Sequence, residues 1–262
     1  MNTWERYFEV IKSFVEDIRK TQGYNIRIAA SLCADASAKG GIVYAYGSWH
    51  SLLIAEENYY RAASPANYCA LAESSINGTH EMSKIRAVEG CYGIGNAIVD
   101  YHRIDPQKDV LICISNGGNN TVTIDAALRA KEKGIPVIAI TSVDYGNTLQ
   151  TTHQCGKKLK DIADVVIDNK CIIGDAAVKL EGYPIQVGPV SGIPMNYIMS
   201  SILVEMSELL IERGLTPEVY LNGHVDHMSE EAKKDAEWLV GIDIKNHNKN
   251  LIDKYFYRIK SL

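Results

Sequence analysis

The stretch VLICISNGGNNTVTIDAALRAKEKGIPVIAIT (residues 110–141) decides the fold class of this chain. Two short runs rich in β-branched residues, 110–115 and 137–141, flank a segment over 121–133 whose apolar residues recur at helical spacing. Strands without polar alternation are typically covered on both faces, as in a parallel sheet. The stretch therefore predicts a strand, a crossover helix and a second, parallel strand.

The same alternation of strand and helix extends on both sides of this unit. Residues 42–47 and 163–168 form further apolar runs, 66–71 form a weaker one, and helical patterns cover 50–63 and 93–102. Strands that alternate with helices at this spacing indicate βαβ units. We predict an α/β fold with a doubly wound, mainly parallel five-stranded sheet flanked by helices, of the flavodoxin-like class.

Both ends of the chain add helices to this sheet. Helical spacing marks residues 3–22, 26–38, 192–214 and 229–240. The segment 241–250 is expected to interrupt this pattern before a last short amphipathic segment. We expect one domain over residues 1–225, including the N-terminal helices, and a helical extension over 226–262 that packs on it.

Composition and charge exclude several classes of protein. The chain has 262 residues and a net charge of −5, and its pI of about 5.8 argues against a nucleic-acid-binding protein. No apolar run approaches the roughly 20 residues of a membrane span, and the N-terminus lacks a signal peptide, so a cytoplasmic location is expected. Cys33, Cys69 and Cys113 lie in apolar runs, which favours reduced core thiols.

Two polar loops follow predicted strands, 47–51 after the first and 115–121 after the central one. Ligands of open parallel sheets bind beyond the carboxyl ends of the strands, where the strand order reverses. Glycines let the backbone approach a ligand, and free amides at a helix start attract anions. The loop 115–121 therefore has the composition of a phosphate site, although a polar turn with a helix cap is the alternative. Neither loop has the three-glycine pattern of dinucleotide-binding enzymes.

The sequence resembles the sugar isomerase (SIS) domain family in both loops. In that family a strand ends in Ser-x-Ser-Gly-x-Thr, which resembles residues 115–121 here, and a helix follows. The first loop and the Ala-Glu-Glu and Tyr-Arg-Ala runs at 55–57 and 60–62 resemble a bacterial branch labelled as phosphoheptose isomerases. The likeness spans about residues 40–225, and its further matching segments are 80–90, 156–169, 174–178 and 188–191.

The resemblance implies that both loops bind the substrate. In the first loop it assigns the sugar to Ser48, His50 and Ser51, next to Gly47 and to Trp49, whose ring could stack on the sugar. In the second loop it assigns the phosphate to Ser115, Asn116, Gly117, Gly118, Asn119, Asn120 and Thr121. The chain departs from the family in four places, and in one of them Leu52 stands where the branch has a second histidine. Trp49 stands where the branch has glycine, Gly117 replaces a serine and Asn120 a threonine. Loss of two hydroxyl donors to a charged oxygen would weaken phosphate binding roughly a hundredfold.

Aldose–ketose exchange needs a base that moves a proton between two adjacent carbons and an acid that donates to the carbonyl oxygen. The resemblance assigns the base to Glu57, with Glu56 as the alternative. Glu57 could instead have no catalytic role and form a surface ion pair with Arg61, four positions later on the same helix. The family's catalytic histidine would lie on the helix 192–214, which contains none. His50 and His80 are the remaining candidates, and His80 could come from a neighbouring subunit.

The expected function is binding of a phosphorylated sugar or amino sugar and its isomerisation. A sugar-phosphate lyase or etherase and a non-catalytic sensor are the alternatives, and we expect neither a cofactor nor a metal. The run His224-Val225-Asp226-His227 has the residue types of a metal site, but its position before Ser229, a helix cap, favours loop polar residues. Surplus apolar positions on the flanking helices predict a homodimer or a dimer of dimers, without nucleic-acid or membrane partners.

Overall fold

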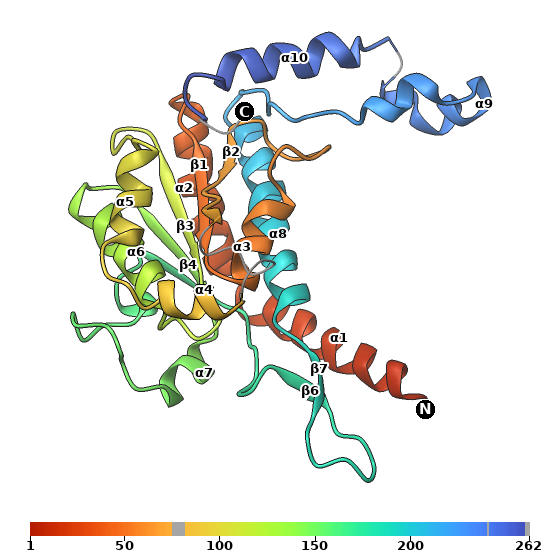
Figure 1. Ribbon diagram of the computed structural model, residues 1–262. Helices are drawn as coiled ribbons and strands as arrows, with labels where there is room; N and C mark the ends of the chain where they lie inside the picture. The colour runs from red at the N-terminus through yellow and green to blue at the C-terminus, as the bar shows by residue number, and fades with distance from the viewer. Residues whose placement is uncertain (75–81, 240, 260–262) are drawn as a thin grey trace.

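The fold is built on a five-stranded parallel sheet (Figure 1). The structure, a computed structural model, describes residues 1–74, 82–239 and 241–259. The strand order is β2-β1-β3-β4-β5, and every pair within this sheet is parallel. Its strands are β1 (Val43–Gly47), β2 (Tyr68–Ala70), β3 (Val110–Ile114), β4 (Val137–Thr141) and β5 (Val165–Asp168). The predicted fold class and all five predicted strands are confirmed.

The register of the sheet places β1 between β2 and β3. Val43 lies opposite Tyr68 on one side and Val110 on the other. All residues of β1, β2, β3 and β4 are buried. Burial on both faces explains why these strands lack polar alternation.

Three helices cover one face of the sheet: α2 (Gly23–Ala38), α3 (His50–Glu57) and α8 (Gly192–Glu212). The apolar stripe that the sequence predicts on the last of these is buried against the sheet, with Ile198 and Ile202 fully inaccessible. Cys33 on α2 is also fully buried and unpaired, as its apolar surroundings predicted.

The opposite face is covered by α5 (Ile94–Tyr101), α6 (Thr121–Glu132) and, at one end, α10 (Ile244–Tyr255). The α5 and α6 helices approach so closely that a Cβ at Gly95 would lie 2.1 Å from the carbonyl oxygen of Val122. Two short helices, α4 (Met82–Val88) and α7 (Val143–Thr148), lie near the carboxyl ends of the strands (Figure 1).

The first helix, α1 (Thr3–Thr21), lies beside a hairpin that the sequence did not predict. Its strands, β6 (Ala176–Val178) and β7 (Val187–Pro189), pair antiparallel. The hydroxyl of Tyr7 donates a hydrogen bond of 2.6 Å to the carbonyl oxygen of Pro189. Figure 1 shows the helix and the hairpin projecting together from one end of the sheet.

Two sequence predictions about helix boundaries are wrong. The helix predicted over 50–63 ends at Glu57, because Tyr60 and Ala63 adopt positive φ angles of 48° and 68°, which a right-handed helix excludes. The segment 241–250 does not interrupt the pattern, because α10 begins at Ile244, where the side chain of Asp243 caps it by accepting from the amide of Asn246.

The chain after α8 forms a second layer of short helices and α10. The 3₁₀ helix η3 (Gly223–His227) replaces the loop expected there, and α9 (Glu230–Lys233) and the 3₁₀ helix η4 (Lys234–Leu239) divide the helix expected over 229–240. Another 3₁₀ helix, η2 (Leu159–Asp161), precedes β5. The boundary between residues 225 and 226 stays a prediction.

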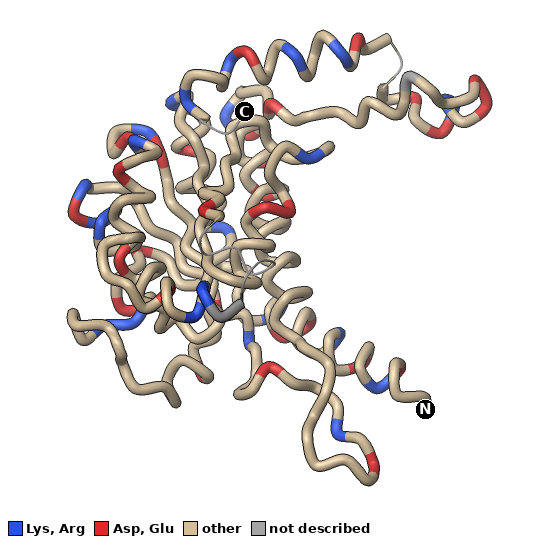
Figure 2. Tube along the Cα trace, viewed as in Figure 1, with Lys and Arg blue, Asp and Glu red and all other residues tan. Residues whose placement is uncertain are grey.

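Charged residues of both signs are interspersed along the chain (Figure 2). On α10, for example, lysines and acidic residues follow one another along the helix, with Lys249 paired to Asp253. Over the described part of the chain, no helix combines the length and the apolar character needed to cross a membrane.

Candidate active site

The two polar loops predicted from the sequence lie at the point where the strand order reverses. From β1 the chain proceeds to β2 on one side, whereas β3 lies on the other side. The loop 47–51 follows β1, and the loop 115–121 follows β3. Because parallel neighbours end at the same edge of a sheet, both loops meet there, which is where open α/β sheets bind their ligands.

The first loop is a tight turn from β1 into α3. A Cβ at Gly47 would lie 2.7 Å from Ser51, so the turn closes only around a glycine. Trp49 adopts a positive φ of 56°, while the amide of Ser51 donates to the carbonyl oxygen of Ser48 at 3.1 Å. Ser48 is buried and His50 exposed.

The second loop is held by two glycines against the neighbouring strand end. Gly118 has a φ of 60°, and its amide donates to the carbonyl oxygen of the buried Ser115 at 3.1 Å. A Cβ at Gly117 would lie 2.8 Å from the Cδ1 of Leu149.

Two asparagines of the second loop have their side chains engaged within the protein. Asn116 accepts a hydrogen bond of 2.9 Å through its Oδ1 from the side-chain amide of Asn169. Asn119 donates through Nδ2 to the carbonyl oxygen of Gln150 at 2.8 Å. These side chains therefore fix the loop to the ends of neighbouring segments. The sequence had placed both against the phosphate, an assignment that stays a prediction.

Asn120 joins the two loops and brings in a residue that the sequence analysis missed. Its Nδ2 donates to the Oγ of Ser48 at 3.1 Å and to the Oε2 of Glu89 at 2.9 Å. Glu89 follows α4, and its carbonyl oxygen also accepts from the amide of Val122 at 3.3 Å. The only signal in the sequence was its position at the end of the matching segment 80–90.

Glu89 lines a cavity of about 500 Å³ above the second loop, a volume typical of small-molecule sites. Other residues on its wall are Arg86, Tyr92, Asn119, Asn120 and Thr121. Burial raises the pKa of the Glu89 carboxyl above the usual value for glutamate, and its hydrogen bond from Asn120 opposes that shift. A carboxylate with a raised pKa in a cleft is a candidate proton acceptor.

The same cavity contains the N-terminal end of α6. Within the described parts of the chain, the backbone amides of Asn119, Asn120 and Thr121 donate no hydrogen bond. Free amides and the positive end of the helix dipole favour a bound anion. The guanidinium of Arg86 adds a positive charge on the same wall.

A buried pair of residues supports one side of this cavity. The Nε2 of His153 lies 3.0 Å from the Oδ1 of Asp125, and its Nδ1 accepts from the amide of Cys155 at 3.1 Å. The second carboxylate oxygen of Asp125 accepts from the amide of Gly93 at 2.6 Å. Asp125 on α6 thereby holds the segment after α7 and the start of α5 in place.

The carboxylates predicted from the sequence lie elsewhere on α3. Glu57 is exposed and forms an ion pair with Arg61, which is the non-catalytic alternative that the sequence suggested for it. Glu56 is half-buried, and burial raises its pKa. Neither residue is on the wall of the cavity. His80 lies outside the described residues, and the roles of all these residues stay predictions.

The described residues contain no group of three or more histidine, cysteine, aspartate or glutamate side chains that could hold a metal ion. His224 and His227 belong to η3, which lies at the opposite end of the molecule from α4 (Figure 1).

Comparisons with known proteins agree with this architecture. A family model described as the SIS domain matches residues 6–142. A UPF0309 protein of Thermoanaerobacter pseudethanolicus is 32% identical over 260 residues, which covers 98% of this chain and 98% of that protein. Another UPF0309 protein, from Halalkalibacterium halodurans, is 32% identical over 220 residues, 84% of this chain and 90% of the relative.

A solved structure of a phosphoheptose isomerase from Francisella tularensis shares the fold. Its TM-score is 0.52 at 18% sequence identity, and the match covers 79% of this chain and 100% of that one. At this identity the likeness concerns the fold alone. The family match and the two sequence relatives establish the conclusion that the chain belongs to the SIS domain family and to the UPF0309 proteins.

Proposed function

We propose that this protein binds a phosphorylated sugar or amino sugar in the cavity lined by Glu89 and the start of α6, and catalyses its isomerisation. The single observation that carries the proposal is the contact of Asn120 with Glu89. It holds a carboxylate of raised pKa beside the free amides at the start of α6. An anion site next to a proton acceptor is the combination that sugar-phosphate isomerisation requires.

In this proposal the phosphate lies against the N-terminal end of α6. The amides of Asn119, Asn120 and Thr121 donate to its oxygens, and Arg86 balances its charge. These backbone donors make up for the two hydroxyl donors that are lost because Gly117 and Asn120 stand where the family has serine and threonine. The side chain of Asn120 does not contact the phosphate in this proposal. It is hydrogen-bonded to Ser48 and Glu89 and holds the proton acceptor, Glu89, in position.

We assign proton abstraction next to the carbonyl carbon to Glu89. Its carboxylate is half-buried and faces the cavity, whereas Glu57 is exposed and paired with Arg61. A raised pKa brings the basicity of a glutamate closer to neutral conditions, which favours general-base catalysis. Glu57 and Glu56 remain the alternative bases, and His50 at the start of α3 is a candidate acid.

A lyase or etherase is the second candidate function. It is favoured by α8, whose 21 residues include no histidine at the place where the resemblance expects the isomerase acid. Cleavage that begins with proton abstraction by a carboxylate would use the same cavity and the same Glu89. The cytoplasmic location and the homodimer expected from the sequence stay predictions.

The test is exchange of substrate protons with solvent. The protein is incubated in D₂O with aldose and ketose phosphates of five to seven carbons and their 2-amino and 2-acetamido forms, and NMR follows deuterium incorporation beside the carbonyl carbon. We expect incorporation with at least one compound, and product signals then separate isomerisation from cleavage.

The variants Glu89→Gln and Glu57→Gln identify the base. Loss of exchange in the first variant alone supports Glu89, and loss in the second alone transfers the role to Glu57. Glu132→Gln, an exposed residue at the far end of α6, is the control. Binding of sugar phosphates without any exchange would instead establish a sensor and contradict the catalytic part of the proposal.

A further inference from the structure

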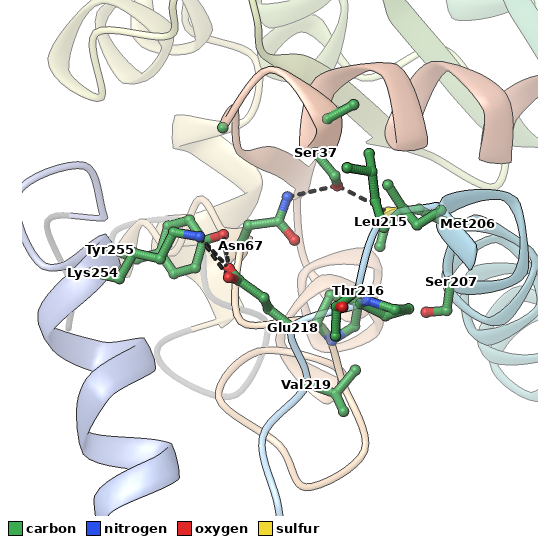
Figure 3. A pocket seen from close by; sticks show the side chains of 15 residues that line it. Ser37, Asn67, Met206, Ser207, Leu215, Thr216, Glu218, Val219, Lys254 and Tyr255 are labelled. Carbon is green, nitrogen blue, oxygen red and sulfur yellow. Dashed lines mark hydrogen bonds and ion pairs between the residues drawn. The ribbon is translucent and has the colours of Figure 1, made fainter. Parts of the chain in front are cut away.

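A second cavity lies at the opposite edge of the sheet. It has a volume of about 430 Å³ and is bounded by the C-terminal end of α2, by α8 and by α10 (Figure 3). Gly40 and Asn67 on its wall precede β1 and β2, so the cavity faces the amino ends of these strands. None of its lining residues belongs to the first cavity.

Asn67 provides a hydrogen-bond acceptor on the wall of this cavity. The residue is only 4% exposed, and its Nδ2 donates to the Oγ of Ser37 at 2.8 Å and to the carbonyl oxygen of Gly41 at 2.9 Å. No donor among the described residues reaches its Oδ1, which Figure 3 shows turned away from Ser37. This oxygen is an acceptor on the cavity wall, to which a ligand hydroxyl can donate.

The charged groups of the cavity already satisfy each other. The carboxylate of Glu218 accepts from the Nζ of Lys254 at 2.6 and 2.7 Å and from the hydroxyl of Tyr255 at 2.6 Å (Figure 3). Lys254 is the one cationic residue on the wall among those described. A phosphate would have to displace Glu218 to reach it, so the cavity does not suit a phosphorylated ligand.

On the α8 side the wall combines the apolar side chains of Met206, Leu210 and Leu215 with the hydroxyl groups of Ser207 and Thr216. A cavity with acceptors on one side and apolar groups on the other matches a compound that carries hydroxyl groups on a hydrocarbon frame. We propose that this cavity is a second binding site, which takes an uncharged polyhydroxy compound, a sugar or polyol without phosphate. The α10 helix supplies one wall through Lys254 and Tyr255, which gives the C-terminal extension a function.

The experiment titrates the full-length protein with D-sorbitol, D-glucose and N-acetyl-D-glucosamine, and with D-glucose 6-phosphate for comparison. Saturation-transfer NMR and calorimetry measure binding. We expect saturable binding of at least one uncharged probe. Thr216→Trp, which places a large side chain at an exposed position on the wall, should weaken that binding at least tenfold. Glu218→Gln should weaken it as well and, by freeing Lys254, admit the phosphorylated probe.

Two control variants make the outcome specific to this cavity. Asp253→Asn removes the other acid–lysine pair of α10, between Lys249 and Asp253, and should leave binding unchanged. Glu89→Gln alters the first cavity and should also leave it unchanged, so the result is independent of the proposed catalytic function. Saturation by none of the uncharged probes below about 10 mM would overturn the inference. So would binding that Thr216→Trp leaves intact, or that Glu89→Gln abolishes.

Discussion

The side-chain amide of Asn120 lies 3.1 Å from the hydroxyl oxygen of Ser48 and so connects the loops that end β1 and β3. The same nitrogen holds Glu89 at 2.9 Å. One asparagine thus fixes the relative position of the first loop, the start of α6 and a carboxylate of raised pKa.

The rate of proton exchange should depend on pH through Glu89. A general base is active when deprotonated, so the rate should increase with pH through the pKa of Glu89, which burial raises above its usual value. In Asn120→Ala one of the interactions that lower this pKa is lost, and the acidic limb of the profile should move to higher pH. An acidic limb that stays in place would show that another group titrates.

Replacing Glu89 should not destabilise the protein at neutral pH. The folded-state pKa is raised, so the folded protein favours the protonated carboxyl, and stability decreases as pH rises through that pKa. A neutral glutamine side chain at this position removes the effect. We expect the melting temperature of Glu89→Gln to equal or exceed that of the unmodified protein at pH 8, with a smaller difference near pH 4. A clearly lower melting temperature at pH 8 would contradict the role of burial.

Gly47→Ala should distort the first loop. A methyl group there would lie 2.7 Å from Ser51, and overpacking of this kind costs about 1–3 kcal/mol. Chemical denaturation would measure the loss. Gly90→Ala is the control, because a Cβ at Gly90 would lie 3.7 Å from the nearest atom, an ordinary contact distance. Equal stability of the two variants would contradict the prediction.

Asp109→Ala should detach the end of the chain from the sheet. The Asp109 side chain is fully buried and accepts from the amide of Ile42 at 2.8 Å and from Arg258 at 2.7 Å. Removing one partner of such a pair costs about 3–5 kcal/mol. Denaturation and protease digestion at the C-terminus would measure the effect. Arg129→Ala, which breaks an exposed pair with Asp100, should cost about 1 kcal/mol or less.

The architecture was predictable because its signal is local. The runs at 42–47, 110–115, 137–141 and 163–168 are mainly apolar and lack polar alternation, a pattern typical of strands covered on both faces. The two loops were also predictable, because each directly follows one of these strands. The hairpin of β6 and β7 was not predictable from the sequence. Val187 in β7 is exposed, so these short strands carry no apolar pattern that would indicate them.

The sequence by itself determined the parallel sheet, the helices around it and the edge at which a ligand would bind. The reason is that the burial of each strand and helix leaves its apolar pattern in a short stretch of chain. Only the tertiary structure decided which carboxylate faces the cavity. Asn120 and Glu89 are 31 positions apart, and their contact depends on how α4 and α6 pack rather than on either local pattern. The same holds for Glu218 and Lys254, which meet because α10 folds back over the amino ends of the strands.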